Sequence, residues 1–173
     1  MAIEIERKFL VADPTVLDGR SGTEIAQGYL PVAEPASVRV RLKRDATGAS
    51  AFLTVKQGRN ALARLEFEYG IPVADAEEML EQLCGAARVR KTRYEIEHAG
   101  SLWEVDRFEA ENAPLVLAEI ELASEEAIFE PPPWLGVEVT EDPRMMNLAL
   151  CRRPLAAWDE AERTALLDQE RPC

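Results

Sequence analysis

Glu4, Glu6 and Lys8, close to the amino terminus, are the first residues whose types and spacing could do chemistry. They are spaced two apart, with Ile5 and Arg7 between them. Successive side chains of a β-strand point to opposite faces, so this spacing places two carboxylates and an ammonium on one face. In a single half-buried strand such a face simply meets water. The pattern therefore gains meaning only if it recurs.

The alternation of charged and apolar side chains does recur, in about eight segments that turn residues separate. The segments are residues 3–11, 38–43, 53–56, 62–69, 89–97, 103–106, 116–122 and 137–140. Such a series predicts an antiparallel β architecture. A sheet of this size can remove its edges by closing into a barrel.

Either face of the strands could line the inside of such a barrel. An apolar lining gives a common barrel with a greasy core, whereas a charged lining gives a polar tunnel. Like-charged neighbours such as Arg39 and Arg41, or Glu119 and Glu121, repel each other unless a counter-charge lies between them. This favours the tunnel, because the two signs of charge can pair there or bind ligands.

A charged tunnel also needs helices that cover its apolar outer face, and two segments have helical periodicity. Residues 73–83 carry one apolar stripe, and residues 155–167 carry another. The stripes consist of Val73, Ala76, Met79, Leu80 and Leu83, and of Leu155, Trp158, Ala161, Ala165 and Leu167. We expect both helices to lie on the outside of the sheet.

The charged faces supply two complementary sets of groups. Carboxylates are the hard oxygen ligands that Mg²⁺ and Mn²⁺ prefer, and arginine forks match the oxygens of phosphate. The carboxylates are Glu4, Glu6, Glu104, Asp106, Glu119, Glu121 and Glu138, and the cations are Lys8, Arg39, Arg41, Lys56, Arg64, Lys91 and Arg93. Together they are typical of phosphoryl transfer, in which positioning and charge neutralisation do most of the catalysis. The alternative is an interior network of structural salt bridges.

Composition narrows the classes of function. With 173 residues the chain fits one domain, residues 1–173, with a carboxy-terminal helix at about 154–169 and a loose tail. The net charge of −12 argues against binding to nucleic acid or to an anionic membrane. No apolar run is long enough for a transmembrane helix, and the charged amino-terminal strand does not resemble a signal peptide.

Particular residue types exclude other kinds of site. His98 is the only histidine, which excludes a histidine-based zinc site and a Ser-His-Asp triad. The three cysteines, Cys84, Cys151 and Cys173, are scattered along the chain and predict reduced thiols in a cytoplasmic protein. The sequence also lacks a glycine-rich phosphate loop of the P-loop or Rossmann type.

A set of motifs resembles the CYTH superfamily, the triphosphate tunnel metalloenzymes. Glu4-x-Glu6-x-Lys8 alone is weak evidence, but further motifs follow in the family's order over residues 1–150. They are Gln27-Gly28-Tyr29-Leu30, Val38-Arg39-Val40-Arg41-Leu42, Thr54-Val55-Lys56, Arg64-x-Glu66-x-Glu68, Lys91-x-Arg93, Glu104-Val105-Asp106-Arg107-Phe108, Ala118-Glu119-Ile120-Glu121-Leu122 and Glu138-Val139-Thr140.

The resemblance implies an α+β fold, in which a closed antiparallel barrel of eight strands forms a tunnel surrounded by helices. It also implies hydrolysis or cyclisation of a triphosphate with Mg²⁺ or Mn²⁺. By analogy the metal ligands would be Glu4, Glu6, Asp106, Glu119 and Glu121. The phosphate ligands would be Lys8, Arg39, Arg41, Lys56, Lys91 and Arg93, with Arg64 as a further substrate-binding residue. Arg64, Glu66, Glu68, Glu104 and Glu138 could pair with these groups and orient them.

Lys8 and Tyr29 resemble a pair assigned to catalysis in short bacterial members of the family. Lys8 could transfer a proton if neighbouring cations depress its pKa. For Tyr29 the alternative is a packed ring that follows a turn.

The family includes inorganic triphosphatases, thiamine triphosphatases and class IV adenylate cyclases, which differ in what is attached to the phosphates. No aromatic platform for a base or a thiazole is evident, because the chain is only 6% aromatic. We therefore expect hydrolysis of inorganic triphosphate, a small anionic substrate, with cyclase or thiamine triphosphatase activity as alternatives. A noncatalytic module that binds polyphosphate or a nucleotide is the alternative from another class. The sequence leaves room for a homodimer.

Overall fold

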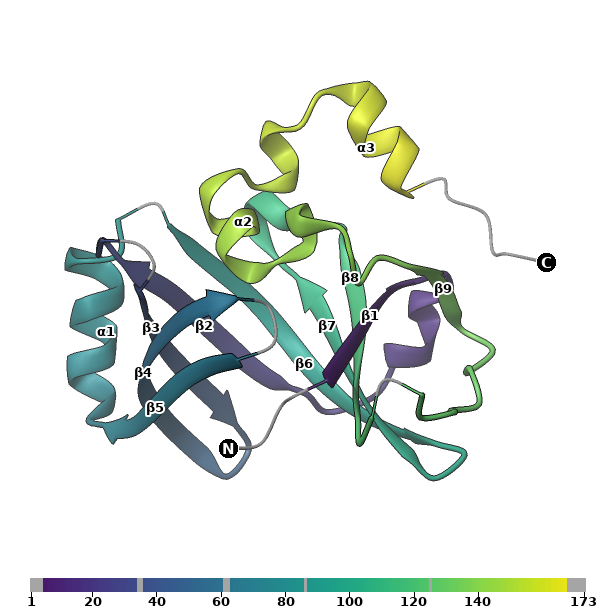
Figure 1. Cartoon of the computed structure of the whole chain (residues 1–173), viewed down its shortest axis with the longest axis horizontal. Coiled ribbons are helices and arrows are strands. Elements are labelled where there is room, and N and C mark those ends of the chain that lie inside the picture. Colours follow the sequence, from purple (N-terminus) through teal and green to yellow (C-terminus); the bar gives the residue numbers. More distant parts are fainter. Residues whose placement is uncertain (1–4, 34–35, 61–62, 86, 125, 168–173) are drawn as a thin grey trace.

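The computed structural model is built around one curled antiparallel sheet with helices at its margins (Figure 1). It describes residues 5–33, 36–60, 63–85, 87–124 and 126–167, and for residues 57–60 and 63–65 the backbone alone. The strands are β1 (Ile5–Val11), β2 (Thr23–Leu30), β3 (Ala36–Asp45), β4 (Gly48–Asn60), β5 (Ala63–Ile71), β6 (Arg88–His98), β7 (Ser101–Phe108), β8 (Val116–Leu122) and β9 (Leu135–Glu138). The strand order is β5-β4-β3-β2-β6-β7-β8-β1-β9.

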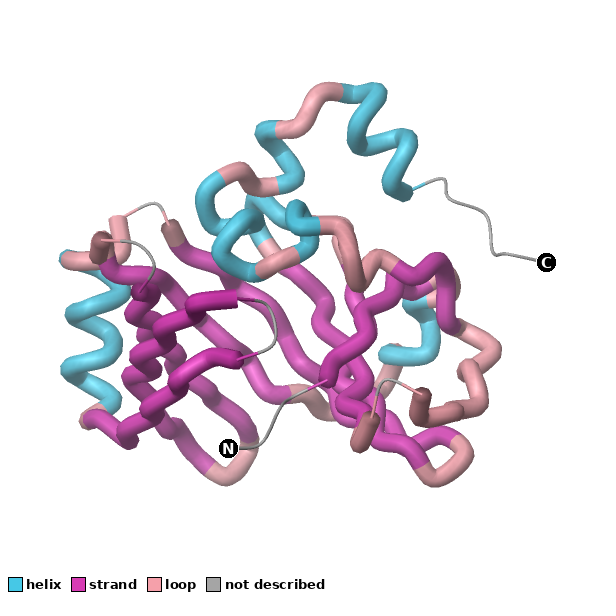
Figure 2. Tube along the Cα trace, in the orientation of Figure 1, coloured by secondary structure: helices cyan, strands magenta, loops and turns pink. Residues whose placement is uncertain are grey.

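Helices and turns of 3₁₀-helix connect or cover these strands (Figure 2). The α-helices are α1 (Val73–Gln82), α2 (Asn147–Arg152) and α3 (Glu160–Leu167), and the 3₁₀ turns are η1 (Pro14–Leu17), η2 (Ala110–Asn112), η3 (Pro143–Met145) and η4 (Leu155–Ala157). No helix in the described part of the chain is long and apolar enough to span a membrane.

The expected closed barrel of eight strands is wrong in two respects. The sheet has nine strands, and in the described residues β5 and β9 are its edges and do not pair with each other. The strand that the charge alternation missed is β2, whose side chains are mostly small or neutral. The free edge of β1 is occupied by β9, and β5 pairs with neither strand in the described residues. The sheet nonetheless curls, so that β4 and β5 pass in front of β2 and β6 (Figure 1).

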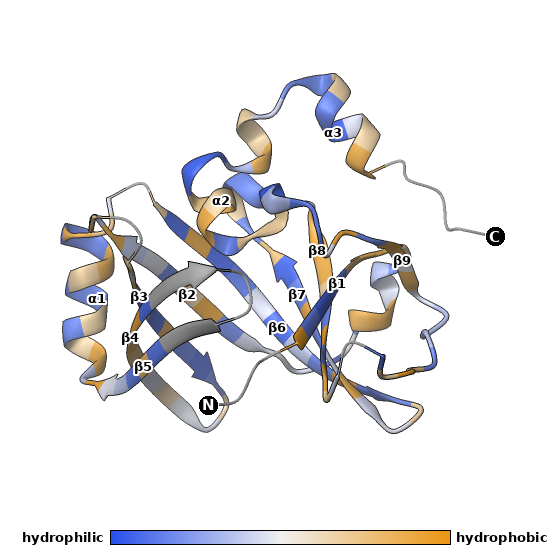
Figure 3. Cartoon of the chain, in the orientation of Figure 1, coloured by the Kyte–Doolittle hydropathy of each residue, from blue (hydrophilic) through white to orange (hydrophobic). Residues whose placement is uncertain are grey.

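The apolar outer face of β3 and β4 is covered by α1, as the sequence predicts. Ala76 and Leu80 of α1 pack with Val40 and Leu42 of β3 in one buried cluster. Leu83, the last residue of the expected stripe, lies just beyond the helix and is exposed. The two faces of the strands can be followed as alternating polar and apolar colours in Figure 3.

A second apolar cluster covers the outer face of β1, β7 and β8. Trp103 is fully buried there and makes edge-on ring contacts with Phe9, Phe129 and Trp134. Phe129 and Trp134 come from the segment between β8 and β9, which is therefore fixed over this face by aromatic packing.

The carboxy-terminal segment does not lie where the sequence predicted. Leu155, Trp158 and Leu166 are its buried residues, whereas the expected stripe contained Leu167, which is exposed. The single helix expected at about 154–169 is instead the turn η4, a break at Trp158 and the short helix α3. The tail beyond residue 167 lies outside the described residues.

This segment packs against the face of the sheet that also carries the charges, not against the outer face. Its cluster includes Leu10, Val89, Phe108 and Leu117, which stand two residues along their strands from Lys8, Lys91, Asp106 and Glu119. The charged face therefore becomes apolar at one end, and α2 with its neighbours covers that end. We call the charged side the inner face.

Gly28 on β2 provides a test of how closely α1 approaches the sheet. A Cβ at this position would lie 2.7 Å from Cys84 Cβ and 2.8 Å from Cys84 Sγ. We therefore expect Gly28→Ala to lower the free energy of unfolding by about 1–3 kcal/mol, measured by urea denaturation. At Gly70 on β5 no atom lies within 4 Å of the added Cβ. Gly70→Ala is the matched control, and equal stability of the two variants would contradict the prediction.

Candidate functional site

The inner face brings residues from both halves of the sheet together. In the register of the strands, Lys8 of β1 lies opposite Glu119 of β8, which lies opposite Glu104 of β7. Leu10 of β1 and Tyr29 of β2 also pack in one apolar cluster, although three strands separate β1 from β2. The two walls of the curled sheet therefore face each other across a shared interior.

Arg93 of β6 is the centre of the acidic wall. Its Nε donates to Asp106 Oδ1 at 2.7 Å and its Nη2 to Asp106 Oδ2 at 2.6 Å, a bidentate pair. Nη2 also donates to Glu119 Oε2 at 2.9 Å, and Nη1 donates to Glu104. Although burial opposes it, these three carboxylates raise the pKa of Arg93. One guanidinium thus separates three carboxylates that would otherwise repel one another.

Lys8 bridges the next pair of carboxylates. Its Nζ lies 2.8 Å from Glu119 Oε1 and 3.3 Å from Glu6 Oε1. Burial lowers the pKa of Lys8, but attraction to Glu119 and Glu6 outweighs it and the net shift is upward. Proton transfer by Lys8 required a depressed pKa, so with these partners Lys8 is held as a cation.

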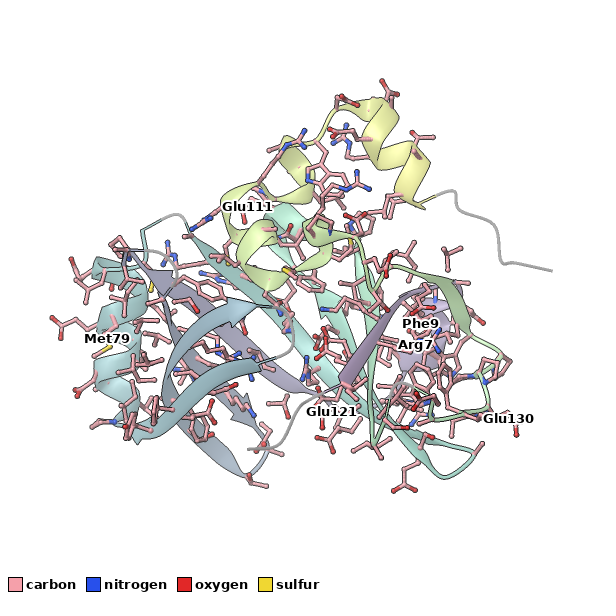
Figure 4. All side chains as sticks on the ribbon, in the orientation of Figure 1. Arg7, Phe9, Met79, Glu111, Glu121 and Glu130 are labelled. Atoms are coloured by element: carbon pink, nitrogen blue, oxygen red, sulfur yellow. The ribbon has the colours of Figure 1, made fainter. Side chains whose placement is uncertain are left out.

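Two carboxylates bind Lys8, and a third lies opposite one of them in the strand register. Glu6 lies opposite Glu121 in the register, and both have exposed side chains, while Glu119 is buried. The Glu6 side chain is only 43% exposed, and this partial burial, followed by the charge of Glu119, raises the pKa of Glu6. Glu6 and Glu119 therefore repel each other. Figure 4 shows Glu121 near the lower end of β1 and β8.

This donor set fits a divalent cation chemically. Its hard carboxylate oxygens repel each other and are held around the ammonium of Lys8, a position that favours positive charge. Among the described residues, however, no three acidic, thiol or imidazole groups already form a metal-binding cluster. Glu4, the remaining predicted ligand from β1, lies outside the described residues.

The opposite wall is basic. Arg39 Nη2 donates to Thr54 Oγ1 at 3.1 Å and to Glu68 Oε2 at 3.2 Å, and Lys56 Nζ lies 2.7 Å from Glu66 Oε2. Arg39 Nε is buried and has no hydrogen-bond partner. Arg64 lies on β5 opposite Gly58, but its side chain is outside the described residues.

Arg41 is the least compensated cation of the basic wall. Its Nε donates to Gln27 Oε1 at 3.2 Å, and in the described part of the chain it forms no salt bridge. Burial lowers the pKa of Arg41, and the charges of Arg39 and Arg93 lower it further. A cation held under these conditions favours an anionic ligand.

Tyr29 lies beside these arginines. Gln27 Nε2 donates to Tyr29 Oη at 3.3 Å. Burial raises the pKa of Tyr29, although Arg39, Arg41 and Lys8 lower it in part. The hydroxyl therefore stays protonated at neutral pH and can donate a hydrogen bond.

The family model of the CYTH domain matches residues 2–149. The chain belongs to the CYTH domain family. An inorganic triphosphatase of Acetivibrio thermocellus is 43% identical over 160 residues, which cover 92% of this chain and 100% of that protein. An inorganic triphosphatase of Nitrosomonas europaea is 44% identical over 151 residues, which cover 85% and 95%.

Solved structures show the same CYTH fold. The crystal structure of an inorganic triphosphatase matches with a TM-score of 0.66 and 39% identity, and the match covers 87% of this chain and 95% of that one. A putative adenylate cyclase from Bacillus halodurans matches with a TM-score of 0.52 and 19% identity over 72% and 82% of the two chains. The second likeness concerns the fold alone.

Within this CYTH domain, one predicted inner residue faces the other way. Glu138 lies on β9 and binds Arg7, whose Nε donates to Glu138 Oε1 at 2.8 Å. Arg7 is on the outer face of β1 and stacks on the rings of Phe9 and Phe129. Figure 4 shows Arg7 and Phe9 on the side of β1 away from β4 and β5. Glu138 is therefore not part of the site.

Three polar residues of the site are not among the site residues predicted from the sequence. Gln27 and Thr54 follow the period of the inner face and are fully buried, so period alone could have indicated them. Asn147 of α2 receives a hydrogen bond of 3.3 Å from Lys91 Nζ. No pattern in the sequence connects Asn147 with β6, because the contact depends on how the carboxy-terminal segment folds back.

The buried carboxylate of Asp106 predicts how stability depends on pH. Although burial opposes it, Lys91 and Arg93 lower the pKa of Asp106 from 3.8 to about 2. A lowered pKa stabilises the fold above the unfolded value of the pKa, and that stabilisation is lost as the pH falls toward 2. Between pH 5 and 3 we expect the wild type to lose about 1 kcal/mol more unfolding free energy than Asp106→Asn, in urea titrations at each pH. Parallel pH curves would refute this.

Proposed function

We propose that this CYTH domain hydrolyses inorganic triphosphate with a divalent metal ion, between the two walls of the inner face. The observation that carries the proposal is the uncompensated charge on the basic wall. Arg41 has no carboxylate partner among the described residues, and Arg39 has a buried Nε without an acceptor. A chain of phosphates supplies both the negative charge and the acceptors. The two relatives named inorganic triphosphatase support the same activity.

The basic wall would bind the phosphates through different kinds of contact. Arg39 and Arg41 offer planar forks that match phosphate oxygens in pairs, and Lys56 offers a mobile point charge. Lys8 and Arg93 complete the ring of cations from the acidic wall, and Tyr29 can donate one hydrogen bond from its protonated hydroxyl. Arg64 stays a predicted ligand. Binding of this kind aligns the triphosphate and screens its charge.

The acidic wall would hold the metal. Glu6, Glu119 and Glu121 are the described ligands that we propose, with Glu4 as a further one, and their oxygens suit Mg²⁺ or Mn²⁺. When bound, such an ion neutralises phosphate charge and lowers the pKa of a water molecule. Metal binding would compete with Lys8 for Glu6 and Glu119, which frees the ammonium to contact phosphate. Both oxygens of Asp106 are already bound by Lys91 and Arg93, so we do not assign it to the metal.

The described inner face favours an inorganic substrate over a nucleotide or a thiamine ester. Its two phenyl rings are already covered, because Phe108 is buried at the apolar end and Lys43 lies 5.6 Å above the ring of Phe52. The larger aromatic cluster, around Trp103, lies on the outer face. Tyr29, the remaining aromatic residue of the described inner face, packs against the apolar cluster, so none of these rings offers a free face to an attached base.

A substrate panel tests the proposed activity. Initial rates of phosphate release are measured for tripolyphosphate, ATP and thiamine triphosphate, each with Mg²⁺ and with Mn²⁺. We expect tripolyphosphate to have a kcat/KM at least about 10-fold above the other two, because binding energy comes from the phosphates alone. Activity should disappear with a chelator. Faster formation of cyclic AMP, or faster turnover of thiamine triphosphate, would assign the site to another reaction, and binding without turnover would indicate a noncatalytic module.

Matched glutamate variants test the acidic wall. Glu6→Gln and Glu119→Gln each remove a proposed ligand charge and keep the shape of the side chain, so we expect kcat/KM to fall by about 100-fold or more. Glu138→Gln is the control on the outer face, where the side chain binds Arg7. It should change kcat/KM by less than about 2-fold. Full activity in both inner variants would exclude the proposed metal site.

A further inference from the structure

Gln27 of β2 lies beside Arg41 on the basic wall, although it carries no charge. The residue is 0% exposed, and in the strand register it lies opposite Arg41 of β3 on one side and Val89 of β6 on the other. A buried side-chain amide has a donor and an acceptor that both need partners. Here the two partners are Arg41 and Tyr29, which we propose to contact phosphate.

These partners fix which way the amide of Gln27 points. A guanidinium can only donate hydrogen bonds, so the oxygen of the amide must face Arg41. Arg41 Nε donates to Gln27 Oε1 at 3.2 Å, and Gln27 Nε2 therefore faces Tyr29 and donates to its Oη at 3.3 Å. The hydrogen bonds thus run in one direction, from Arg41 through Gln27 to Tyr29.

This direction leaves donors on both partners free for a ligand. Tyr29 Oη accepts from Gln27, so its own hydrogen points elsewhere, and no described residue accepts that hydrogen. Arg41 is held through its Nε, and its two Nη atoms have no acceptor among the described residues. Because Gln27 is neutral, it holds the guanidinium without cancelling its charge. The free donors of Arg41 and Tyr29 match the oxygens of a phosphate chain.

We infer that Gln27 is a positioning residue, which orients Arg41 and sets the direction of the Tyr29 hydroxyl so that both donate to the phosphates. Gln27 itself is buried and does not touch the substrate. The inference rests on the proposed function, since it concerns the substrate of that site. It gives a role to a residue that was not among the site residues predicted from the sequence.

A neutral acceptor differs from a carboxylate at this position. Arg39 and Arg93 are bound by carboxylates, which cancel part of their charge. A carboxylate in place of Gln27 would also bind Arg41, and it can only accept from Tyr29, which reverses the direction of the Tyr29 hydrogen. It would stabilise the fold, because a partly buried cation without a carboxylate partner gains one. It would also weaken phosphate binding, whereas a purely structural residue moves stability and affinity the same way.

Gln27→Glu tests this opposition of stability and affinity. Stability is measured by thermal unfolding, and the affinity of the whole protein for tripolyphosphate by calorimetry with a chelator present, so that a metal contact does not contribute. We expect Gln27→Glu to unfold about 2–4 °C above the wild type. We expect it to bind tripolyphosphate at least about 30-fold more weakly. A lower unfolding temperature together with weaker binding would indicate a structural role and overturn the inference, and so would unchanged affinity.

Tyr29→Phe tests whether Gln27 sets the direction of the hydroxyl. In the wild type we expect it to weaken tripolyphosphate binding by about 10-fold, because a hydrogen bond to a charged group is lost. In Gln27→Glu we expect less than about a 2-fold loss, because there the hydroxyl donates to the new carboxylate and not to phosphate. Equal losses in the two backgrounds would contradict the inference.

Lys56→Met is the matched control for this comparison. Lys56 is on β4, its Nζ lies 2.7 Å from Glu66 Oε2, and β3 separates it from Gln27 on β2. Its contact with phosphate should not depend on Gln27. We therefore expect Lys56→Met to weaken binding by the same factor, within about 2-fold, in the wild type and in Gln27→Glu.

Gln27→Met keeps the experiment decisive if Gln27→Glu does not fold. It removes the acceptor of Arg41, adds no charge and keeps about the same volume. We expect affinity to fall by about 3–10-fold in the wild type and by less than about 2-fold in Arg41→Met, because Gln27 acts through Arg41. Equal losses in both, or none in the wild type, would overturn the inference. Wild-type binding without phosphate release would contradict the proposed hydrolysis alone, and absence of binding would contradict both.

Discussion

The pairing of opposite charges across the inner face is the constraint on which the rest of the structure depends. Lys8 and Arg93 each bind two or more carboxylates, and without them the row Glu104–Glu119 would place like charges directly opposite each other on neighbouring strands. Strands whose charged faces can only be balanced by one another must curl toward a common interior. Among the described residues the balance is incomplete at Arg41 on the basic wall and at Glu6 and Glu121, which lie opposite each other on the acidic wall, so the interior is a site for ligands and not a closed network of salt bridges.

The apolar parts of the fold follow from this arrangement. Because the charges occupy the inner face, the opposite face must be buried from outside, and α1 and the aromatic cluster around Trp103 do this. The carboxy-terminal segment packs at a different place. It covers the end of the inner face where Leu10, Phe108 and Leu117 replace charged residues, and through Asn147 it contacts Lys91. The same segment thus closes the apolar end and supplies an acceptor to a buried ammonium, which links its folding to the electrostatics of the site.

The period of two predicted most of the site, because a residue's face in a strand depends only on parity. It placed Arg39, Arg41, Arg93 and Glu119 on the inner face correctly. It failed for β2, whose residues near Gln27 carry no charge to alternate. It failed for Glu138 because β9 pairs with β1 through an irregular register, and the side chain points to Arg7. Long-range packing decided the remaining cases, such as the break of the carboxy-terminal helix at Trp158 and the contact of Asn147, and single-sequence periodicity carries no information about either.

Burial distinguishes residues that lie on the same face of their strands. Lys8, Lys56 and Lys91 all lie on the inner face, yet their side chains are 12%, 27% and 0% exposed. At the open end a lysine exchanges its carboxylate partner for a phosphate at little cost, because water solvates whichever group is released. At the apolar end the same exchange would leave a buried carboxylate without water, which makes the exchange more costly. The distance of a lysine from the apolar end, a matter of one or two residues, therefore affects how easily it can exchange its carboxylate for a phosphate. The chemistry of an inner-face residue has to be assigned from its burial together with its type.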